Sequence, residues 1–279
     1  MSVETIRVST EWLDLREGAD AAARSRELVG ELGRHLPASG VQVIHDLACG
    51  TGAMGRWLAP LLPGRQHWVL HDRDADLLDV AAARCPAPAA DGAPVDVETR
   101  CSDITRLTAD DLGGTGLITA SALLDLLTRD ELDGLLDVCL AAKCPLLLTL
   151  SVAGHVELAP ADLLDARVAA AFDAHQRRMT GRGRLLGPDA VAAAVAELSA
   201  AGSRVLVRRS AWRLGAAEAG LAAAWLRGWI AAACEQEPEL ADEIGSYAHG
   251  RLAAAQVGRL AVTVGHADLL ALPRDREAA

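Results

Sequence analysis

The sequence predicts an α/β fold, with a seven-stranded, mostly parallel β-sheet and helices on both of its faces. Between Val41 and Val152, short apolar segments alternate regularly with segments of helical character. Several apolar segments are continuously hydrophobic, such as PLLLTLSV at 145–152, which is typical of parallel strands covered on both sides. Turn residues such as Pro63-Gly64 mark the boundaries between segments.

A helical segment comes before this alternation. Residues 10–37 carry a broken apolar stripe at helical spacing, and Pro37 and Gly40 end the segment. Five strands follow, at 41–47, 67–71, 94–101, 116–122 and 145–152. Helices between them are predicted at 52–62, at 74–85 and after the N-cap residue Thr128.

The rhythm changes beyond Gly154. Four helices are predicted there, at 160–179, 187–202, 215–235 and 238–257, with a sixth strand at 203–210 and a seventh within 259–272. The sequence shows no repeat and no disordered linker, so we expect residues 1–279 to form one domain. Its expected parts are a helical cap (1–40), a core (41–152), a lid insertion (153–186) and a C-terminal part (187–279) that completes the sheet with inserted helices.

The charge balance argues against two classes of partner. The 279 residues carry a formal net charge of −11, whereas proteins that grip phosphate backbones usually present a basic face. No apolar run approaches the roughly 18 residues that span a bilayer, and the N-terminus lacks the pattern of a signal peptide. We expect a cytoplasmic protein without nucleic-acid or membrane partners; the sequence does not determine its oligomeric state.

The cysteines give no sign of a disulfide framework or of a metal site. None of them forms a CxxC pair, and no histidine completes a zinc spacing. We therefore expect reduced thiols and no bound metal. The six are Cys49, Cys85, Cys101, Cys139, Cys144 and Cys234.

The most informative motif, DLACGTG at 46–52, directly follows the first predicted strand. Gly50 and Gly52 allow a ligand to approach the backbone closely where a helix begins. Residues 50–55 also satisfy the GxGxxG pattern of dinucleotide-binding proteins. Asp46 argues against such a ligand, because its carboxylate would repel a pyrophosphate but would suit an ammonium group.

Two further acids follow at corresponding places. Asp72 ends the second predicted strand, where a carboxylate can accept hydrogen bonds from both hydroxyls of a ribose. Asp103 follows the third strand and could accept from an adenine amino group, with Ile104 covering the ring. Together with Asp46, these acids indicate a nucleoside ligand that carries an ammonium group.

These motifs, in this order and at this spacing, resemble those of class I S-adenosylmethionine (SAM)-dependent methyltransferases over residues 41–152. The resemblance implies a Rossmann-like fold and SAM as the cofactor. Ala48 stands where that family usually has glycine. Arg73 stands where an apolar residue often stacks on adenine, so its guanidinium either stacks instead or points to solvent. The positions that the resemblance places at SAM are Asp46, Ala48, Gly50, Gly52, Asp72, Arg73, Asp103, Ile104 and Ser121.

The loop after the fourth strand, SALLDL at 121–126, bears on the methyl acceptor. It lacks the Asn/Asp-Pro-Pro-Tyr/Phe motif of amide-nitrogen methyltransferases, and the chain lacks both the Pro-Cys nucleophile of cytosine C5 enzymes and the acidic set of magnesium-dependent catechol-type enzymes. These absences favour a metal-independent enzyme that acts on a small molecule. Asp125 either contacts the acceptor or cofactor or is a solvated acid.

His175 is the candidate general base. It ends the apolar face of the predicted lid helix 160–179, and its ordinary pKa near 6.5 suits proton abstraction, although a structural role is the alternative. Arg178 follows it and could hold a carboxylate of the acceptor.

The predicted cap contributes further polar residues. Arg16, Asp20 and Arg24 recur at a spacing of four, which indicates either a salt-bridged surface or a cap that closes over SAM and orders a polar acceptor. Trp212, after the sixth strand, either lines the acceptor pocket or packs in the core.

The sequence thus predicts transfer of a methyl group from SAM to an oxygen or nitrogen nucleophile of a small molecule. Two alternatives stay open. One is a SAM-binding protein of this fold without methyl transfer. The other is a NAD(P)-dependent oxidoreductase, which would leave Asp46 and Asp103 unexplained.

Overall fold

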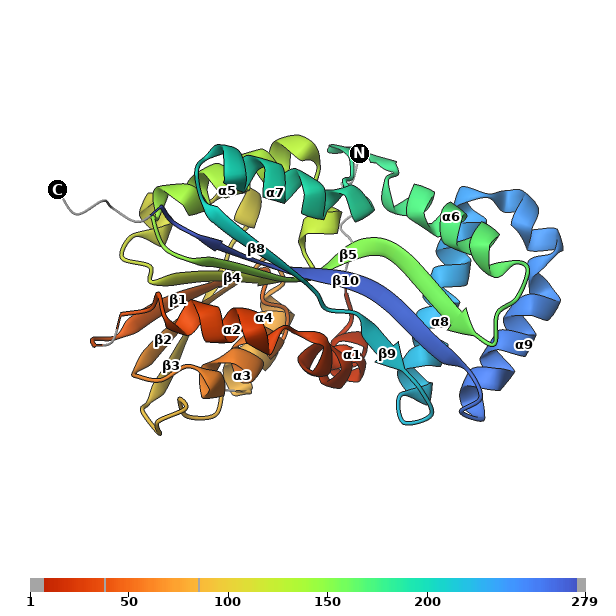
Figure 1. The fold of residues 1–279 in the computed structure, drawn as a ribbon, viewed down its shortest axis with the longest axis horizontal. Coiled ribbons are helices and arrows are strands. Elements are labelled where there is room, and N and C mark those ends of the chain that lie inside the picture. The colour runs from red at the N-terminus through yellow and green to blue at the C-terminus, as the bar shows by residue number, and fades with distance from the viewer. Residues whose placement is uncertain (1–7, 38, 85, 275–279) are drawn as a thin grey trace.

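The computed structural model describes residues 8–274 except 38 and 85. Within them, an eight-stranded sheet runs in the order β3-β2-β1-β4-β5-β10-β8, and β9 also pairs with β10 (Figure 1). Its strands are β1 (Gln42–Leu47), β2 (Gln66–Asp72), β3 (Val95–Cys101), β4 (Leu117–Ser121), β5 (Leu146–Ala159), β8 (Arg204–Arg209), β9 (Trp212–Leu214) and β10 (Ala261–Leu272). The short strands β6 (Met179–Thr180) and β7 (Gly183–Arg184) form a separate hairpin.

The mostly parallel sheet that the sequence predicts is confirmed. Strands β1 to β5 pair in parallel with their neighbours, whereas β10 is antiparallel to both β5 and β8. The expected sixth strand is divided, because β8 ends at Arg209 and β9 begins at Trp212. Both pieces pair with β10, so the sheet has eight strands instead of seven.

Helices cover both faces of the sheet, as expected. On one face, α2, α3 and α4 pack through Leu28, Trp57 and Leu78. On the other, α5 and α7 pack through Leu132 and Leu198. The helices are α1 (Thr10–Ala23), α2 (Arg26–Gly33), α3 (Ala53–Leu58), α4 (Ala75–Ala83), α5 (Arg129–Ala141), α6 (Asp165–Gln176), α7 (Ala190–Ala200), α8 (Ala219–Gln236) and α9 (Ile244–Gln256).

Strand β5 is longer than the sequence predicts. It was expected to end at Val152, but it continues to Ala159 because β10 pairs with it from Leu146 to Ala159, with register shifts between Val264 and His266 and between Ala267 and Leu269. Residues 146–151 are buried on both faces, whereas exposure alternates from 152 onward. The first part of β5 therefore lies inside the sheet, and the second part has one face against helices and the other toward solvent.

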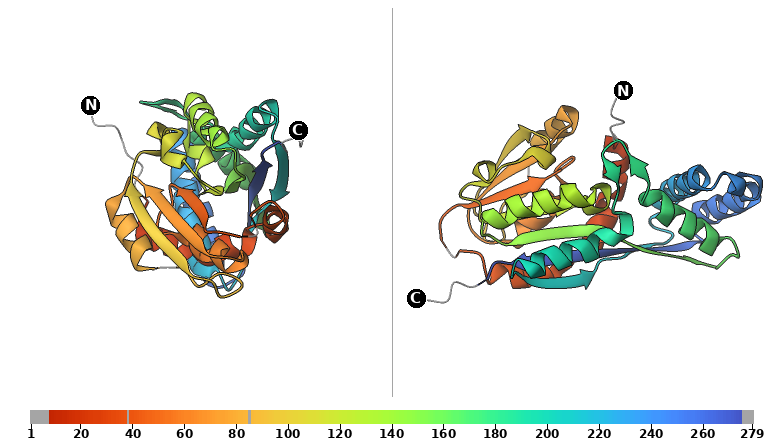
Figure 2. Two further views of the ribbon diagram at one scale, coloured as in Figure 1. Left: turned by 90° about the vertical axis from the view of Figure 1, so that its left-hand side faces the viewer. Right: turned by 90° about the horizontal axis from the view of Figure 1, so that it is seen from above.

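The extended ends of β5 and β10 carry a separate body, which we call the distal body: α6, α8, α9 and β9 with residues 152–159 and 261–266. Its apolar core includes Val168, Trp212, Leu226 and Trp229, and it is distinct from the two clusters on the faces of the sheet. The view from above shows the same separation (Figure 2, right). The predicted helix 160–179 belongs to this body, but it begins only at Asp165 and ends at Gln176.

The predicted helix 10–37 is two helices. Helix α1 ends at Ala23, and α2 begins after Ser25, whose hydroxyl accepts from the Leu28 N–H at 3.3 Å. The Ser25 N–H donates instead to Asp268 in β10, at 2.7 Å. Arg24, between the helices, has extended backbone (ψ 139°), so it does not continue the helical face of Arg16 and Asp20.

Candidate functional site

The three acids singled out from the sequence lie together at one edge of the sheet. Asp46 is the second-last residue of β1, Asp72 ends β2, and Asp103 follows β3. These strands are adjacent and parallel, so their carboxyl ends meet at the same edge. In open α/β sheets this edge is where ligands bind.

The loop between β1 and α3 is shaped by backbone that favours glycine. Ala48, Gly50 and Gly52 all have positive φ, at 53°, 54° and 79°. The Gly50 N–H donates to Asp72 Oδ2 at 2.9 Å, which joins the loop to the end of β2. A left-handed backbone at Ala48 explains why glycine is the favoured residue there, at a modest strain for alanine.

Asp46 is buried with incomplete hydrogen bonding. Its side chain is 1% exposed, and Oδ1 accepts from the Thr119 hydroxyl at 2.8 Å. Oδ2 is buried without a hydrogen-bond partner among the described residues. Burial raises the pKa of this carboxyl from 3.8 to about 7, although Thr119 and Arg24 oppose that rise. A cation placed at Oδ2 would favour the ionised form.

Asp103, Ile104 and Arg73 lie at the outer part of the same edge. Asp103 is half-exposed and accepts from the N–H and hydroxyl of Thr105, at 3.0 and 2.7 Å. Ile104 is partly buried against the cluster beneath α5, and Arg73 is exposed. The outer edge thus presents a carboxylate beside an apolar side chain.

Two buried histidines stand behind the acids. His45, His71 and Ser102 each precede one of the three acids, and because side chains alternate along a strand, His45 and His71 point to the face opposite Asp46 and Asp72. His45 Nδ1 lies 2.9 Å from His71 Nε2, and His71 Nδ1 lies 3.0 Å from Ser102 Oγ. Burial lowers the pKa of both imidazoles to about 4. This row of neutral hydrogen-bonded groups links the ends of three strands, and no local pattern in the sequence predicts it.

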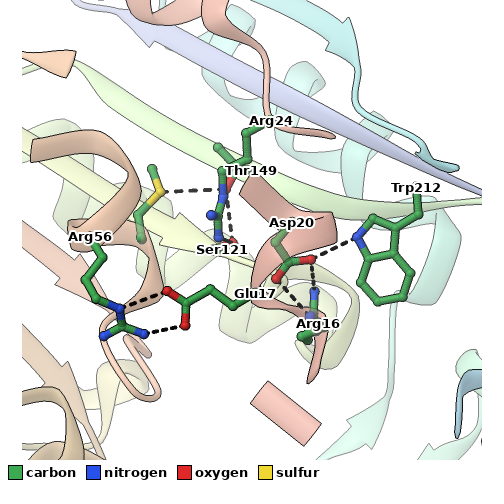
Figure 3. A network of polar contacts seen from close by, with 9 residues as sticks. Arg16, Glu17, Asp20, Arg24, Arg56, Ser121, Thr149 and Trp212 are labelled. Carbon is green, nitrogen blue, oxygen red and sulfur yellow. Dashed lines mark hydrogen bonds and ion pairs between the residues drawn. The ribbon is translucent and has the colours of Figure 1, made fainter. Parts of the chain in front are cut away.

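Helix α1 covers the glycine loop. A Cβ at Gly50 would lie 3.1 Å from Leu13 Cδ1, so α1 is in direct contact with the loop. Glu17 accepts from the Nε and Nη2 of Arg56 on α3, at 2.8 and 2.6 Å (Figure 3). The predicted pair Arg16–Asp20 forms at 2.9 Å, but it is buried instead of lying on the surface.

Trp212 joins this pair. Its indole Nε1 donates to Asp20 Oδ1 at 2.9 Å, and the Arg16 guanidinium lies over its ring at 5.1 Å (Figure 3). Trp212 itself is 3% exposed and belongs to the core of the distal body. The cap, the glycine loop and the distal body therefore meet at α1.

Arg24 was not assigned to the cofactor by the sequence, yet it is 4% exposed and reaches the ends of β4 and β5. Its Nη2 donates to Ser121 Oγ at 2.9 Å and its Nε to Thr149 Oγ1 at 3.4 Å (Figure 3). Thr149 also donates to Ser121, at 3.1 Å. The available signal was the spacing of four from Asp20, which indicated either a salt-bridged surface or a cap over SAM but no contact with Ser121 or Thr149.

Asp125 lies in the short helical turn after β4, at Leu124–Leu126. The residue is half-buried, and Oδ1 is buried with no hydrogen-bond partner in the part of the chain that the structure describes. Burial raises the pKa of this carboxyl to about 6, although the positive charge of Arg16 opposes that rise. A carboxyl that titrates there can exchange a proton near neutral pH.

His175 and Arg178 lie where α6 ends. His175 Nε2 is 3.3 Å from Glu235 Oε2 of α8, and the Arg178 Nη1 donates to the His175 carbonyl at 3.1 Å. Burial and then the charge of Arg178 lower the pKa of the imidazole. These contacts place the pair in the distal body, beside α8.

The described residues contain no group of three or more His, Cys, Asp or Glu side chains placed to hold a metal ion. None of their helices is long and apolar enough to cross a membrane. Cys85 lies outside the described residues, and Cys49, Cys101, Cys139, Cys144 and Cys234 are free thiols.

Comparisons with known proteins find similarity in structure alone. No protein-family model and no curated protein sequence matches the chain. Among solved structures, the cyclopropane synthase MmaA2 from Mycobacterium tuberculosis has 14% identity and a TM-score of 0.51, over 95% of this chain and 94% of its own. A SAM-dependent methyltransferase from Thiobacillus denitrificans, in complex with S-adenosylhomocysteine, has 14% identity and a TM-score of 0.46, over 96% and 100%. With its strand order and reversed β10, the chain has the Rossmann-like fold of the class I SAM-dependent methyltransferases.

Proposed function

We propose that this protein binds SAM and transfers its methyl group to an oxygen or nitrogen nucleophile of a small molecule, without a metal ion. The observation that carries the proposal is the set of three carboxylates, Asp46, Asp72 and Asp103, around a glycine loop on a sheet of this fold. The unpartnered oxygen of Asp46 suits the ammonium of SAM, whereas NAD(P) would bring a pyrophosphate to the same loop.

Each acid has a distinct role in this proposal. Asp72 accepts N–H bonds from Gly50 and Asp74, which leaves lone pairs on both oxygens for the ribose hydroxyls. Asp103 would accept from the adenine amino group while Ile104 covers the ring. Held at these points, the nucleoside has one orientation, which directs its methyl group toward the loops after β4 and β5.

SAM supplies an activated methyl group, so the protein has to align the acceptor and remove its proton. Asp125 supports proton removal best, because it follows β4 at the ligand edge, has an unpartnered oxygen and a pKa of about 6. His175 is the second candidate, but its contacts are with Glu235 and Arg178 in the distal body. Arg16, near Asp125 and over Trp212, is the residue of the cap best placed to meet the acceptor.

Calorimetric titration with SAM, S-adenosylhomocysteine and NAD tests the cofactor. We expect micromolar or tighter binding of the first two and none of NAD. Asp72→Ala should weaken SAM binding by about 2–4 kcal/mol, because it removes charge-assisted hydrogen bonds. The matched control is Asp76→Ala, an exposed acid in the first turn of α4, which should leave the affinity unchanged. Equal affinities for both variants would overturn the cofactor assignment.

The base can be tested by the release of S-adenosylhomocysteine from SAM with a panel of hydroxyl and amine acceptors. The ionised form of Asp125 is the base, so kcat should rise as pH increases through about 6. Asp125→Asn should lower kcat by about 10²–10⁴-fold and abolish its dependence on pH. His175→Ala should leave both kcat and its pH dependence unchanged. The opposite pattern would assign the base to His175.

EDTA should not reduce turnover, and loss of turnover that magnesium restores would contradict the metal-free mechanism.

A further inference from the structure

Arg24 is a buried cation whose hydrogen bonds, among the described residues, go to hydroxyl groups and to no carboxylate. Its guanidinium lies over the Trp57 ring at 5.3 Å and donates to two hydroxyls, those of Ser121 and Thr149. The third nitrogen, Nη1, is buried and has no hydrogen-bond partner within the described residues. Burial lowers the pKa of this guanidinium, which is the expected penalty for a charge removed from water.

The acids near Arg24 are already engaged, with one exception. Asp20 binds Arg16 and Trp212, and Asp268 accepts the N–H groups of Ser25 and Leu150. Asp46 is the exception, because its Oδ2 is unpartnered. Within the described residues, Arg24 Nη1 is thus a buried cationic nitrogen and Asp46 Oδ2 a buried carboxylate oxygen, and both lack a hydrogen-bond partner.

Strand β4 holds these two groups at a fixed spacing. Asp46 is bound by Thr119 and Arg24 by Ser121. The two hydroxyl residues are two positions apart on β4, so their side chains share a face of the sheet. Asp46 and Arg24 therefore meet the same face of β4, close enough for the charge of Arg24 to oppose the rise in the pKa of Asp46. A ligand that carries both an ammonium and a carboxylate could satisfy the two groups together.

We propose that Arg24 binds the α-carboxylate of the methionine part of SAM while Asp46 binds its ammonium. This inference rests on the proposed function. It makes Arg24, at the junction of α1 and α2, a specificity-determining residue that distinguishes ligands with a complete amino-acid group from other adenosine thioethers.

The experiment compares two ligands on the full-length protein. S-adenosylhomocysteine carries the amino-acid group, and 5′-methylthioadenosine lacks it. Arg24→Met should weaken the binding of S-adenosylhomocysteine by about 10- to 100-fold and change that of 5′-methylthioadenosine by less than about threefold. Arg24→Lys should recover part of the loss. Arg26→Met, at an exposed neighbouring arginine on α2, is the matched control and should change neither affinity.

A second measurement needs no variant. The wild-type protein should bind decarboxylated SAM about 10- to 100-fold more weakly than SAM, since only the group that meets Arg24 is missing. Equal affinities for SAM and decarboxylated SAM would overturn the role of Arg24. So would an equal loss of affinity for S-adenosylhomocysteine and 5′-methylthioadenosine in Arg24→Met. Failure of the wild-type protein to bind SAM, S-adenosylhomocysteine or 5′-methylthioadenosine would instead overturn the proposed function.

Discussion

A shielded carboxylate is hydrogen-bonded differently at the edge of the sheet and in the distal body. Asp165 of the distal body accepts from the Tyr247 hydroxyl at 2.7 Å, from Arg251 at 2.6 Å and from the Asp162 N–H at 2.8 Å. Asp46, at the edge of the sheet, accepts from the Thr119 hydroxyl at 2.8 Å, and its other oxygen has no hydrogen-bond partner within the described residues. A fully bonded acid stabilises a fold, whereas an incompletely bonded one is retained at a cost in stability.

Asp46, Arg24 and Asp125 each have an unpartnered polar atom among the described residues, and all three lie around the carboxyl ends of β1, β4 and β5. The distal body also has unpartnered atoms, such as Arg251 Nε and Trp229 Nε1, but its partly buried carboxylate Asp165 is fully bonded. Substitutions in the two regions should therefore change stability in opposite directions.

The largest effect is expected in the distal body. Arg251→Met removes two hydrogen bonds to Asp165 and one to the Pro160 carbonyl, so the free energy of unfolding should fall by about 2–4 kcal/mol. Urea denaturation measures this change. The matched control is Arg227→Met, at an exposed arginine of α8, where we expect less than about 0.5 kcal/mol. A loss below about 1 kcal/mol in Arg251→Met would remove the contrast between the regions.

Asp46→Asn should stabilise the protein. Folding raises the pKa of Asp46 from 3.8 to about 7, so the folded state holds a proton that the unfolded state has released, and wild-type stability falls as pH rises through this window. Asparagine has no such titration. The variant should gain roughly 1–3 kcal/mol at about pH 8, and the gain should vanish near pH 4.

The same variant should bind SAM more weakly, because the amide cannot attract the ammonium as a carboxylate does. Denaturant titrations across the pH range, together with calorimetry, measure both quantities. A pH-independent loss of stability in Asp46→Asn would show that Asp46 supports the fold as Asp165 does.

The smallest effect concerns the contact between α1 and the glycine loop. Glu17 and Arg56 are 28% and 18% exposed, so their pair is partly screened by solvent. Glu17→Gln should weaken SAM binding by about two- to fivefold, with the difference shrinking at high salt. Glu11→Gln, at an exposed position of the same helix, is its control. An effect of Glu17→Gln that does not depend on salt would assign Glu17 a role other than an ion pair.

The sequence predicted the features whose signals are local. An acid at the end of a predicted strand lies at a known edge of the sheet, so the positions of Asp46, Asp72 and Asp103 could be predicted. The capping box of Thr128 and Glu131 confirms the predicted N-cap. The parallel order follows from the alternation of strands and helices, which leaves few possible connections.

Features that depend on distant contacts were missed or misplaced. Arg24 meets Ser121 and Thr149, which are 97 and 125 residues away, and no local pattern encodes those bonds. The second half of β5 alternates as a one-sided strand, but its partner lies in β10, more than 100 residues later, and Gly154 suggested a break. Asp125 was identified as a candidate, yet its shifted pKa depends on burial that only the folded chain provides.

The pairing of β5 with β10 also determines how the distal body is joined to the sheet. The two strands that carry α6, α8 and α9 shift their register between Val264 and His266, where the sheet passes into the distal body, so this junction is an irregular part of the ladder. Helix α1 is attached differently, through the short connection at Arg24 and Ser25. If Arg24 holds the amino-acid group of the cofactor, the ligand contacts the connection between α1 and α2 directly. Binding of the cofactor would then also add a contact that holds α1 against the sheet.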